Sequence, residues 1–243
     1  MKLKKIALAT ILGAGTLMSA SYAQTEIQWW HSMNGALNDW VNDLAKEFNE
    51  SQTDYKIVPV FKGEYEQAMT AGIAAIRSGN APDILQVFEV GTASMINSKG
   101  VVKPVYEIMK ENNIDFDTSS YIPAIASYYA TEKGELLSLP FNSSTTVMYY
   151  NKDAFKKAGL DPEKAPKTWK EVRAATEALK ASGSKCPMTI SWMGWTQLES
   201  FSAWHNVPYA TKNNGFGGLD VELQFNSPLH VKHFENLSDM AKN

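Results

Sequence analysis

The chain has 243 residues, a formal net charge of −3 at pH 7 and 44% hydrophobic residues, enough for a core in one large domain or two small ones. This composition excludes a disordered chain. The mild acidity, with Arg77 and Arg173 as the only arginines, argues against nucleic-acid binding, which selects basic surfaces. The one cysteine, Cys186, excludes an intrachain disulfide.

The first 23 residues have the pattern of a cleavable signal peptide. Three of the first five residues are lysine, no acidic residue precedes Glu26, and residues 6–18 form an apolar stretch too short to span a bilayer. Ser21-Tyr22-Ala23, with small residues at its first and third positions, predicts cleavage before Gln24; a buried N-terminal helix is the alternative. No cysteine directly follows the predicted cleavage site to carry a lipid anchor. We therefore expect a protein without a membrane tether, in a periplasm between two membranes.

The following segment alternates between predicted strands and helices. We expect strands at residues 26–30, 55–61 and 84–88, and helices at 37–48 and 65–77, where apolar residues recur at spacings of three and four. A strand–helix–strand–helix–strand order predicts a parallel sheet with right-handed crossovers. The predicted fold class is therefore α/β.

The rest of the chain is predicted to be mostly helical. Helical patches are expected around Met95 and at 105–109 and 122–129, followed by extended chain at 136–150. A short helix at 152–158 ends at Gly159, and Thr168 with Glu171 has the capping-box pattern that opens a helix at 168–181. A short strand at 187–190 and a helix at 229–240 complete the prediction.

Ligands of such sheets bind beyond the carboxyl ends of the strands. This rule ranks residues 31–34, 62–65, 89–90 and 192–195 first, without naming a ligand.

The stretch YYNKDAFKKAGLDPEKAPKTWKE, residues 149–171, resembles the extracellular solute-binding proteins of bacterial ABC importers. The resemblance implies a two-lobe periplasmic binding protein of type II. It places the N-terminal lobe at 24–140, a hinge crossover at 141–146 and a partial C-terminal lobe at 147–243. Receptors of this kind are nearly twice as long, so we expect the second lobe to be truncated and the return strands of the first lobe to be missing.

Within that family, residues 30–33, 55–59, 62–67, 71–75, 85–92, 140–145 and 213–216 are similar to the receptors for sn-glycerol-3-phosphate. The resemblance implies a monomeric receptor that passes this ligand, or a glycerophosphodiester, to an inner-membrane ABC permease with its ATPase subunits. No catalysis, cofactor, metal or nucleic acid is expected. The family pairs the phosphate with an arginine, and neither Arg77 nor Arg173 matches it.

Five residues match the ligand contacts of those receptors: Tyr65, Glu89, Ser144, Trp192 and Trp195. Hydroxyl groups can donate to phosphate oxygens, a carboxylate can accept from glycerol hydroxyls, and indole rings can pack on the carbon backbone. Each position also has a purely structural interpretation. The tyrosine could pack at the surface, the glutamate could stabilise a helix start, the serine could be a hinge residue, and the tryptophans could belong to a core.

Other candidate sites are weaker. His230 and His233, one helical turn apart, could bind a metal, but a solvated helix face is the preferred interpretation. We find no nucleophile elbow and no base–nucleophile pair, which argues against the alternative of a secreted glycerophosphodiester or sugar hydrolase. A receptor for sugars or maltodextrins remains the alternative within the binding class, since tryptophan also suits sugars.

Overall fold

The computed structural model describes residues 24–96, 98, 100–131, 133–218 and 220–242. The predicted signal peptide, residues 1–23, lies outside the described residues. The chain divides into two compact units, one ending at Ile114 and the other beginning at Asp115. The predicted hinge at 141–146 stays a prediction.

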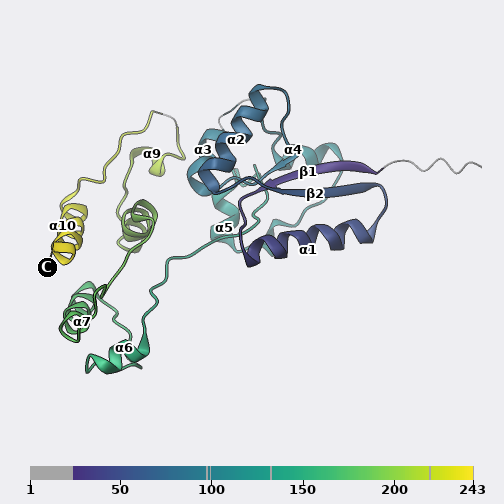
Figure 1. Ribbon diagram of the computed structural model, residues 1–243. Helices are drawn as coiled ribbons and strands as arrows, with labels where there is room; N and C mark the ends of the chain where they lie inside the picture. The colour runs from purple at the N-terminus through teal and green to yellow at the C-terminus, as the bar shows by residue number, and fades with distance from the viewer. Residues whose placement is uncertain (1–23, 97, 99, 132, 219, 243) are drawn as a thin grey trace, which may run out of the picture. The chain divides into compact units, whose positions relative to one another are not determined.

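The first unit contains a three-stranded parallel sheet in the order β2-β1-β3. Strands β1 (Thr25–His31) and β2 (Tyr55–Phe61) pair along their whole length and lie side by side in Figure 1. Strand β3 (Ile84–Leu85) pairs with the other edge of β1. The predicted parallel sheet is confirmed.

Four helices accompany this sheet: α1 (Ala36–Ser51), α2 (Tyr65–Arg77), α3 (Glu89–Ile96) and α4 (Val105–Glu111). Helix α1 buries Val41 and Ala45 and packs on β2. Helix α2 approaches β3 so closely that a Cβ at Gly72 would lie 2.7 Å from Cδ2 of Leu85. The periodic apolar positions thus predicted both crossover helices correctly.

The predicted extent of the third strand, 84–88, was wrong. Its pairing with β1 ends at Trp30 and Leu85. The backbone N–H of Gln86 still donates to the carbonyl of Trp30, and the side chain of Gln86 accepts a hydrogen bond from the backbone of Ser32. Helix α3 then begins at Glu89.

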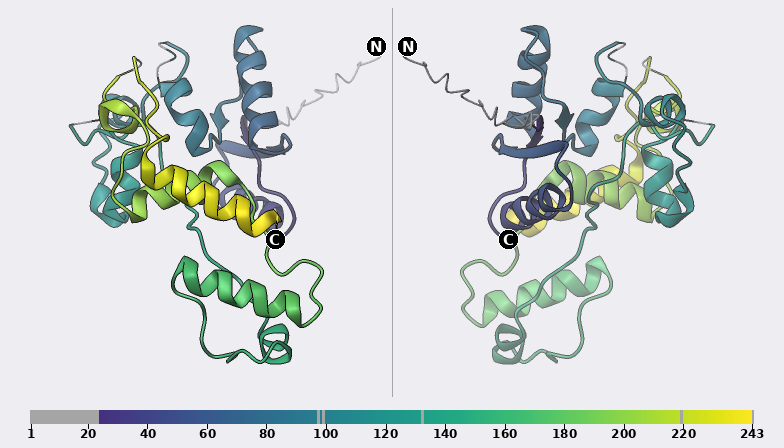
Figure 2. Two further views of the ribbon diagram at one scale, coloured as in Figure 1. Left: turned by 90° about the vertical axis from the view of Figure 1, so that its left-hand side faces the viewer. Right: turned by 90° about the vertical axis from the view of Figure 1, so that its right-hand side faces the viewer.

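The second unit is built from helices and irregular chain. Its elements are η1 (Thr118–Ser120), α5 (Pro123–Tyr128), α6 (Lys152–Lys157), α7 (Trp169–Ala181), η2 (Gly194–Glu199), α8 (Ser200–Trp204), α9 (Thr211–Asn214) and α10 (Pro228–Lys242). Figure 2 shows α10 in yellow beside the green η2–α8 segment. Helices α6 and α7 enclose a small core of Phe155, Ala175 and Leu179.

The prediction of a strand at 187–190 was wrong. A strand is stable only when it pairs with a neighbouring strand, and this segment pairs with none in the described structure. In the described part of this unit, backbone pairing is limited to isolated bridges between Ala130 and Leu136 and between Ala210 and Leu223. None of the helices in the described residues combines the length and apolar character that crossing a membrane requires.

The segment that carries the family resemblance folds as predicted. Asn151 caps α6 by accepting from the backbone of Ala154, and Gly159 takes the left-handed conformation, φ +75°, that ends the helix. The side chains of Thr168 and Glu171 cap α7 reciprocally, as the sequence pattern predicted.

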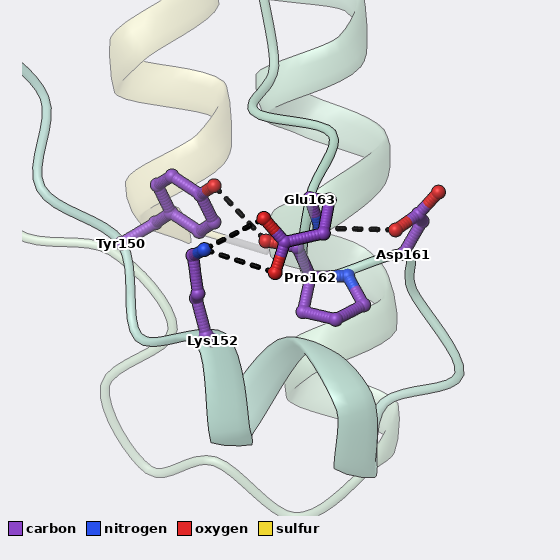
Figure 3. Close-up of polar contacts among 5 residues, drawn as sticks. All are labelled: Tyr150, Lys152, Asp161, Pro162 and Glu163. Carbon is purple, nitrogen blue, oxygen red and sulfur yellow. Dashed lines mark hydrogen bonds and ion pairs between the residues drawn. The ribbon is translucent and has the colours of Figure 1, made fainter.

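The loop between α6 and α7 is fastened to the start of α6 (Figure 3). The hydroxyl of Tyr150 donates to the carbonyl of Pro162 over 3.0 Å, and the ammonium of Lys152 pairs with the carboxylate of Glu163 at 2.8 Å. Glu163 also donates its backbone N–H to the carboxylate of Asp161. These contacts give the motif residues a scaffolding role.

Candidate functional site

The loops at the carboxyl edge of the sheet are tied to one another. The loop after β1 reaches the loop after β3 through the Ser32 backbone N–H, which donates to Oε1 of Gln86 over 2.9 Å. It reaches the start of α2 through Asn34, whose side chain donates to Glu64 over 2.9 Å. The three strand ends therefore form one connected rim, which we call the sheet-edge rim: residues 31–34, 62–65 and 86–89.

Tyr65 and Glu89, two of the predicted ligand contacts, both lie on the sheet-edge rim. Tyr65 is the first residue of α2, and its ring stacks on Phe88 with centroids 5.3 Å apart and planes 3° from parallel. Glu89 follows Phe88 directly and is the first residue of α3, where the helix dipole favours a carboxylate. The structure thus joins the elements that carry these two residues, as the topology rule predicted.

Phe88 was not predicted as a site residue, because the sequence reading assigned it to the third strand. Its position directly before Glu89, a residue that the topology rule ranked first, was the available signal.

The base of the sheet-edge rim is a buried polar turn. His31 and Ser32 are both buried, and Nδ1 of His31 accepts a hydrogen bond from the backbone of Met33. Burial lowers the pKa of His31, so its ring is neutral at pH 7. The hydroxyl of Ser32 is buried without a hydrogen-bond partner within the described structure.

Trp192 and Trp195, the predicted indole contacts, lie together in the second unit. Their rings are 5.8 Å apart and tilted by 58°, and Trp192 is 60% exposed. Trp192 has φ +47°, a left-handed conformation that a bulky residue seldom adopts. The hydroxyl of Thr196 lies within hydrogen-bond distance of the carbonyls of Ser191 and Trp192, which closes this turn.

The segment after Trp192 forms a π-helical turn, η2, in which the N–H of Ser200 reaches the carbonyl of Trp195 five residues back. Such wide turns are rare and occur frequently at functional sites. Gln197, in the middle of η2, is buried and lies 3.1 Å from Nε2 of His233 on α10.

The predicted solvated face at His230 and His233 was wrong. The two residues are 0% and 5% exposed, because α10 packs them against η2, α8 and α7. The ring of His233 stacks on Phe201 at 3.9 Å and meets the edge of Trp169 at 4.9 Å. Burial, then the neighbouring His205 and His230, lower the pKa of His233 to about 4.

Ser202 and His230 form a pair that sequence reasoning missed, with Oγ and Nε2 2.8 Å apart. The Ser202 hydroxyl also lies 2.6 Å from the carbonyl of Leu198, which can only accept, so the serine proton is directed there. Nε2 of His230 is then the donor to Ser202, and Nδ1 accepts from the hydroxyl of Ser227. A histidine nitrogen that donates to the serine hydroxyl cannot accept the serine proton, so His230 does not act as a base for Ser202. The buried pair instead links helices α8 and α10.

Ser144 lies in irregular chain and is exposed. Two residues later, the hydroxyl of Thr146 lies 2.8 Å from that of Ser200, the first residue of α8. The five predicted contacts are thus divided between the units: Tyr65 and Glu89 in the first, and Ser144, Trp192 and Trp195 in the second.

The second unit also contains a polar hollow of about 290 Å³, lined by residues that include Glu199, Asn206, Tyr209 and Asn214. Burial and the nearby Glu199 raise the pKa of Tyr209. None of the five predicted contacts lines this hollow. Within the described residues, no group of three or more His, Cys, Asp or Glu side chains could hold a metal ion.

Comparison with known proteins identifies similar chains. The family model described as "Bacterial extracellular solute-binding protein" matches residues 34–243. The sn-glycerol-3-phosphate-binding periplasmic protein UgpB of Yersinia pestis is 59% identical over 228 residues, 93% of this chain and 52% of the relative. The chain therefore spans about half the length of the curated relatives it matches.

Solved structures of other binding proteins share the fold, and two of them illustrate it. One is the crystal structure of UgpB from Mycobacterium tuberculosis in complex with glycerophosphocholine, with a TM-score of 0.68 at 17% identity. The match covers 90% of this chain and 54% of the UgpB chain. The other is a periplasmic oligogalacturonide-binding protein from Yersinia enterocolitica, with a TM-score of 0.69 at 15% identity. The match covers 90% of this chain and 52% of that protein's chain. At these identities the similarity concerns the fold alone.

Proposed function

Because this chain belongs to the bacterial extracellular solute-binding proteins, we propose that it captures sn-glycerol-3-phosphate, or a glycerophosphodiester, for uptake by an ABC permease. The observation that carries the proposal is the 59% identity, across 93% of the chain, to a receptor named for this ligand. The relative is about twice as long, so the chain supplies part of the contacts that the whole receptor has.

The sheet-edge rim suits this ligand. Tyr65 can donate its hydroxyl to a phosphate oxygen, and the carboxylate of Glu89 can accept from two glycerol hydroxyls. The stack on Phe88 restricts the tyrosine ring, so less side-chain entropy is lost on binding. The indole rings of Trp192 and Trp195 offer apolar faces to a three-carbon backbone.

We infer that no chemistry accompanies binding. A hydrolase would need an accessible nucleophile with a base, and the serine–histidine pair nearest to that description is buried, with the serine proton directed to Leu198. The same proposal places the protein in the periplasm as a monomer, after removal of residues 1–23, with the inner-membrane permease and its ATPase subunits as partners.

Phosphorus NMR of sn-glycerol-3-phosphate mixed with the purified chain tests this function. We expect the ligand signal to broaden and shift with protein concentration and to keep its chemical identity after prolonged incubation. Release of inorganic phosphate would show a hydrolase, and a signal indifferent to the protein would refute capture.

The sugar receptor remains a second candidate, favoured by the exposed indole of Trp192. Competition distinguishes the two. Glycerol-3-phosphate bound in the presence of excess maltose supports our proposal, whereas displacement by maltose supports the sugar receptor.

A further inference from the structure

The π-helical turn η2 faces helix α10 through buried polar contacts. Gln197, 9% exposed, lies with Oε1 3.1 Å from Nε2 of His233. The imidazole of His233 is itself fixed on two sides, by the stacked ring of Phe201 and by the edge of Trp169. The glutamine therefore meets a partner that packing holds in one orientation.

A second contact fixes the segment just after the turn. His230 donates from Nε2 to Ser202 on α8, and its Nδ1 accepts from Ser227, which lies just before α10. Ser227 also accepts the backbone N–H of His230, at 3.4 Å, so its orientation is fixed locally. The first two turns of α10 thus contact both η2 and α8.

The π-helical geometry of η2 sets the orientation of Trp192 and Trp195 relative to α8. A π-turn contains one residue more than an α-helix would need, and each helical residue turns the chain by about 100°. Conversion of η2 to an α-helix would therefore rotate Trp192 and Trp195 relative to α8 by roughly that angle.

We propose that the Gln197–His233 and Ser202–His230 contacts are positioning contacts that keep η2 in its π form and so set the orientation of the Trp192–Trp195 pair. Where a ligand is concerned, this inference rests on the proposed function. The orientation itself can be measured without any ligand.

The first variant is Gln197→Met, which keeps the length of the side chain and removes the acceptor for His233. The matched control is Gln224→Met, the same change at an exposed position of the same unit. The rescue variant is Gln197→Glu, which restores an acceptor oxygen. The readouts are the indole N–H signals of Trp192 and Trp195 and the nuclear Overhauser contacts between their rings.

We expect Gln197→Met to move both indole signals and to lose the ring-to-ring contacts, while the indole of Trp30 in the first unit is unchanged. Gln224→Met should match the wild type, and Gln197→Glu should restore the contacts. Wild-type signals in Gln197→Met would overturn the inference. If Gln197→Met does not fold, Ser202→Ala tests the second contact with the same readouts. Wild-type indole signals in Ser202→Ala would then overturn the inference.

Ligand affinity separates this inference from the proposed function. If the wild type binds sn-glycerol-3-phosphate, Gln197→Met should weaken binding about tenfold, and unchanged affinity would show that ligand binding does not depend on the orientation set by η2. If the wild type does not bind, the proposed function fails, and the indole signals still decide the inference.

Discussion

Acid should destabilise the second unit through His233. The imidazole lies between Phe201 and Trp169, and its Nε2 hydrogen-bonds Gln197 in the neutral state. Burial opposes a positive charge on this ring, and so do the neighbouring His205 and His230. Protonation therefore forces a charge into an apolar and already basic environment.

The magnitude follows from the two pKa values. The pKa of His233 falls from 6.5 to about 4 on folding, and each pKa unit corresponds to about 1.4 kcal/mol. Because the pKa in the folded state is the lower one, stability is fully present above pH 6.5 and is lost as the pH falls toward 4. We expect a loss of about 3 kcal/mol over that interval, a large part of the stability of a small unit.

Urea unfolding at several pH values measures this loss. The indole N–H signals of the tryptophans report the unfolding of each unit separately. Trp195 reports on the second unit and Trp30 on the first, where burial of His31 also lowers a pKa and adds its own dependence. The control is His233→Gln, which can still donate to Gln197 but cannot become charged. An equal loss of stability in wild type and His233→Gln would refute the reasoning.

Two further predictions concern stability. Thr168→Ala removes the side chain that accepts the N–H of Glu171 at the start of α7, and should cost about 1 kcal/mol in urea unfolding of the second unit; no change would mean that the capping box is not formed in solution. Gly72→Ala puts a Cβ 2.7 Å from Leu85 and should cost roughly 1–3 kcal/mol in the first unit; unchanged or increased stability would contradict the close packing of α2 on β3.

Local patterns made much of the fold predictable. The apolar spacing in α1, the capping residues of α7 and the glycine after α6 each act within a few residues, so the sequence displays them directly. The extent of β3 and the absent strand at 187–190 depended on a partner elsewhere in the chain. Pairing of that kind leaves no mark on the segment itself.

The candidate site was predictable only in part. Topology placed Tyr65 and Glu89 on the sheet-edge rim, because chain after parallel strands gathers at one edge. The burial of His230 and His233 was not predictable, since their spacing suits a solvated helix equally well and the contacts come from α7 and α8. Gln197 carried no sequence signal, because a π-turn has no residue pattern of its own.

The central proposal is that the chain captures a glycerophosphate and that the predicted contact residues take part in binding. Amide and indole correlation spectra recorded during titration with sn-glycerol-3-phosphate test it most directly, with Glu89→Gln beside the wild type. The account predicts shifts at Tyr65, Glu89, Trp192 and Trp195, none of them with maltose, and affinity about tenfold weaker in the variant, which loses a charged hydrogen bond. Shifts at these residues with maltose and none with sn-glycerol-3-phosphate would contradict it.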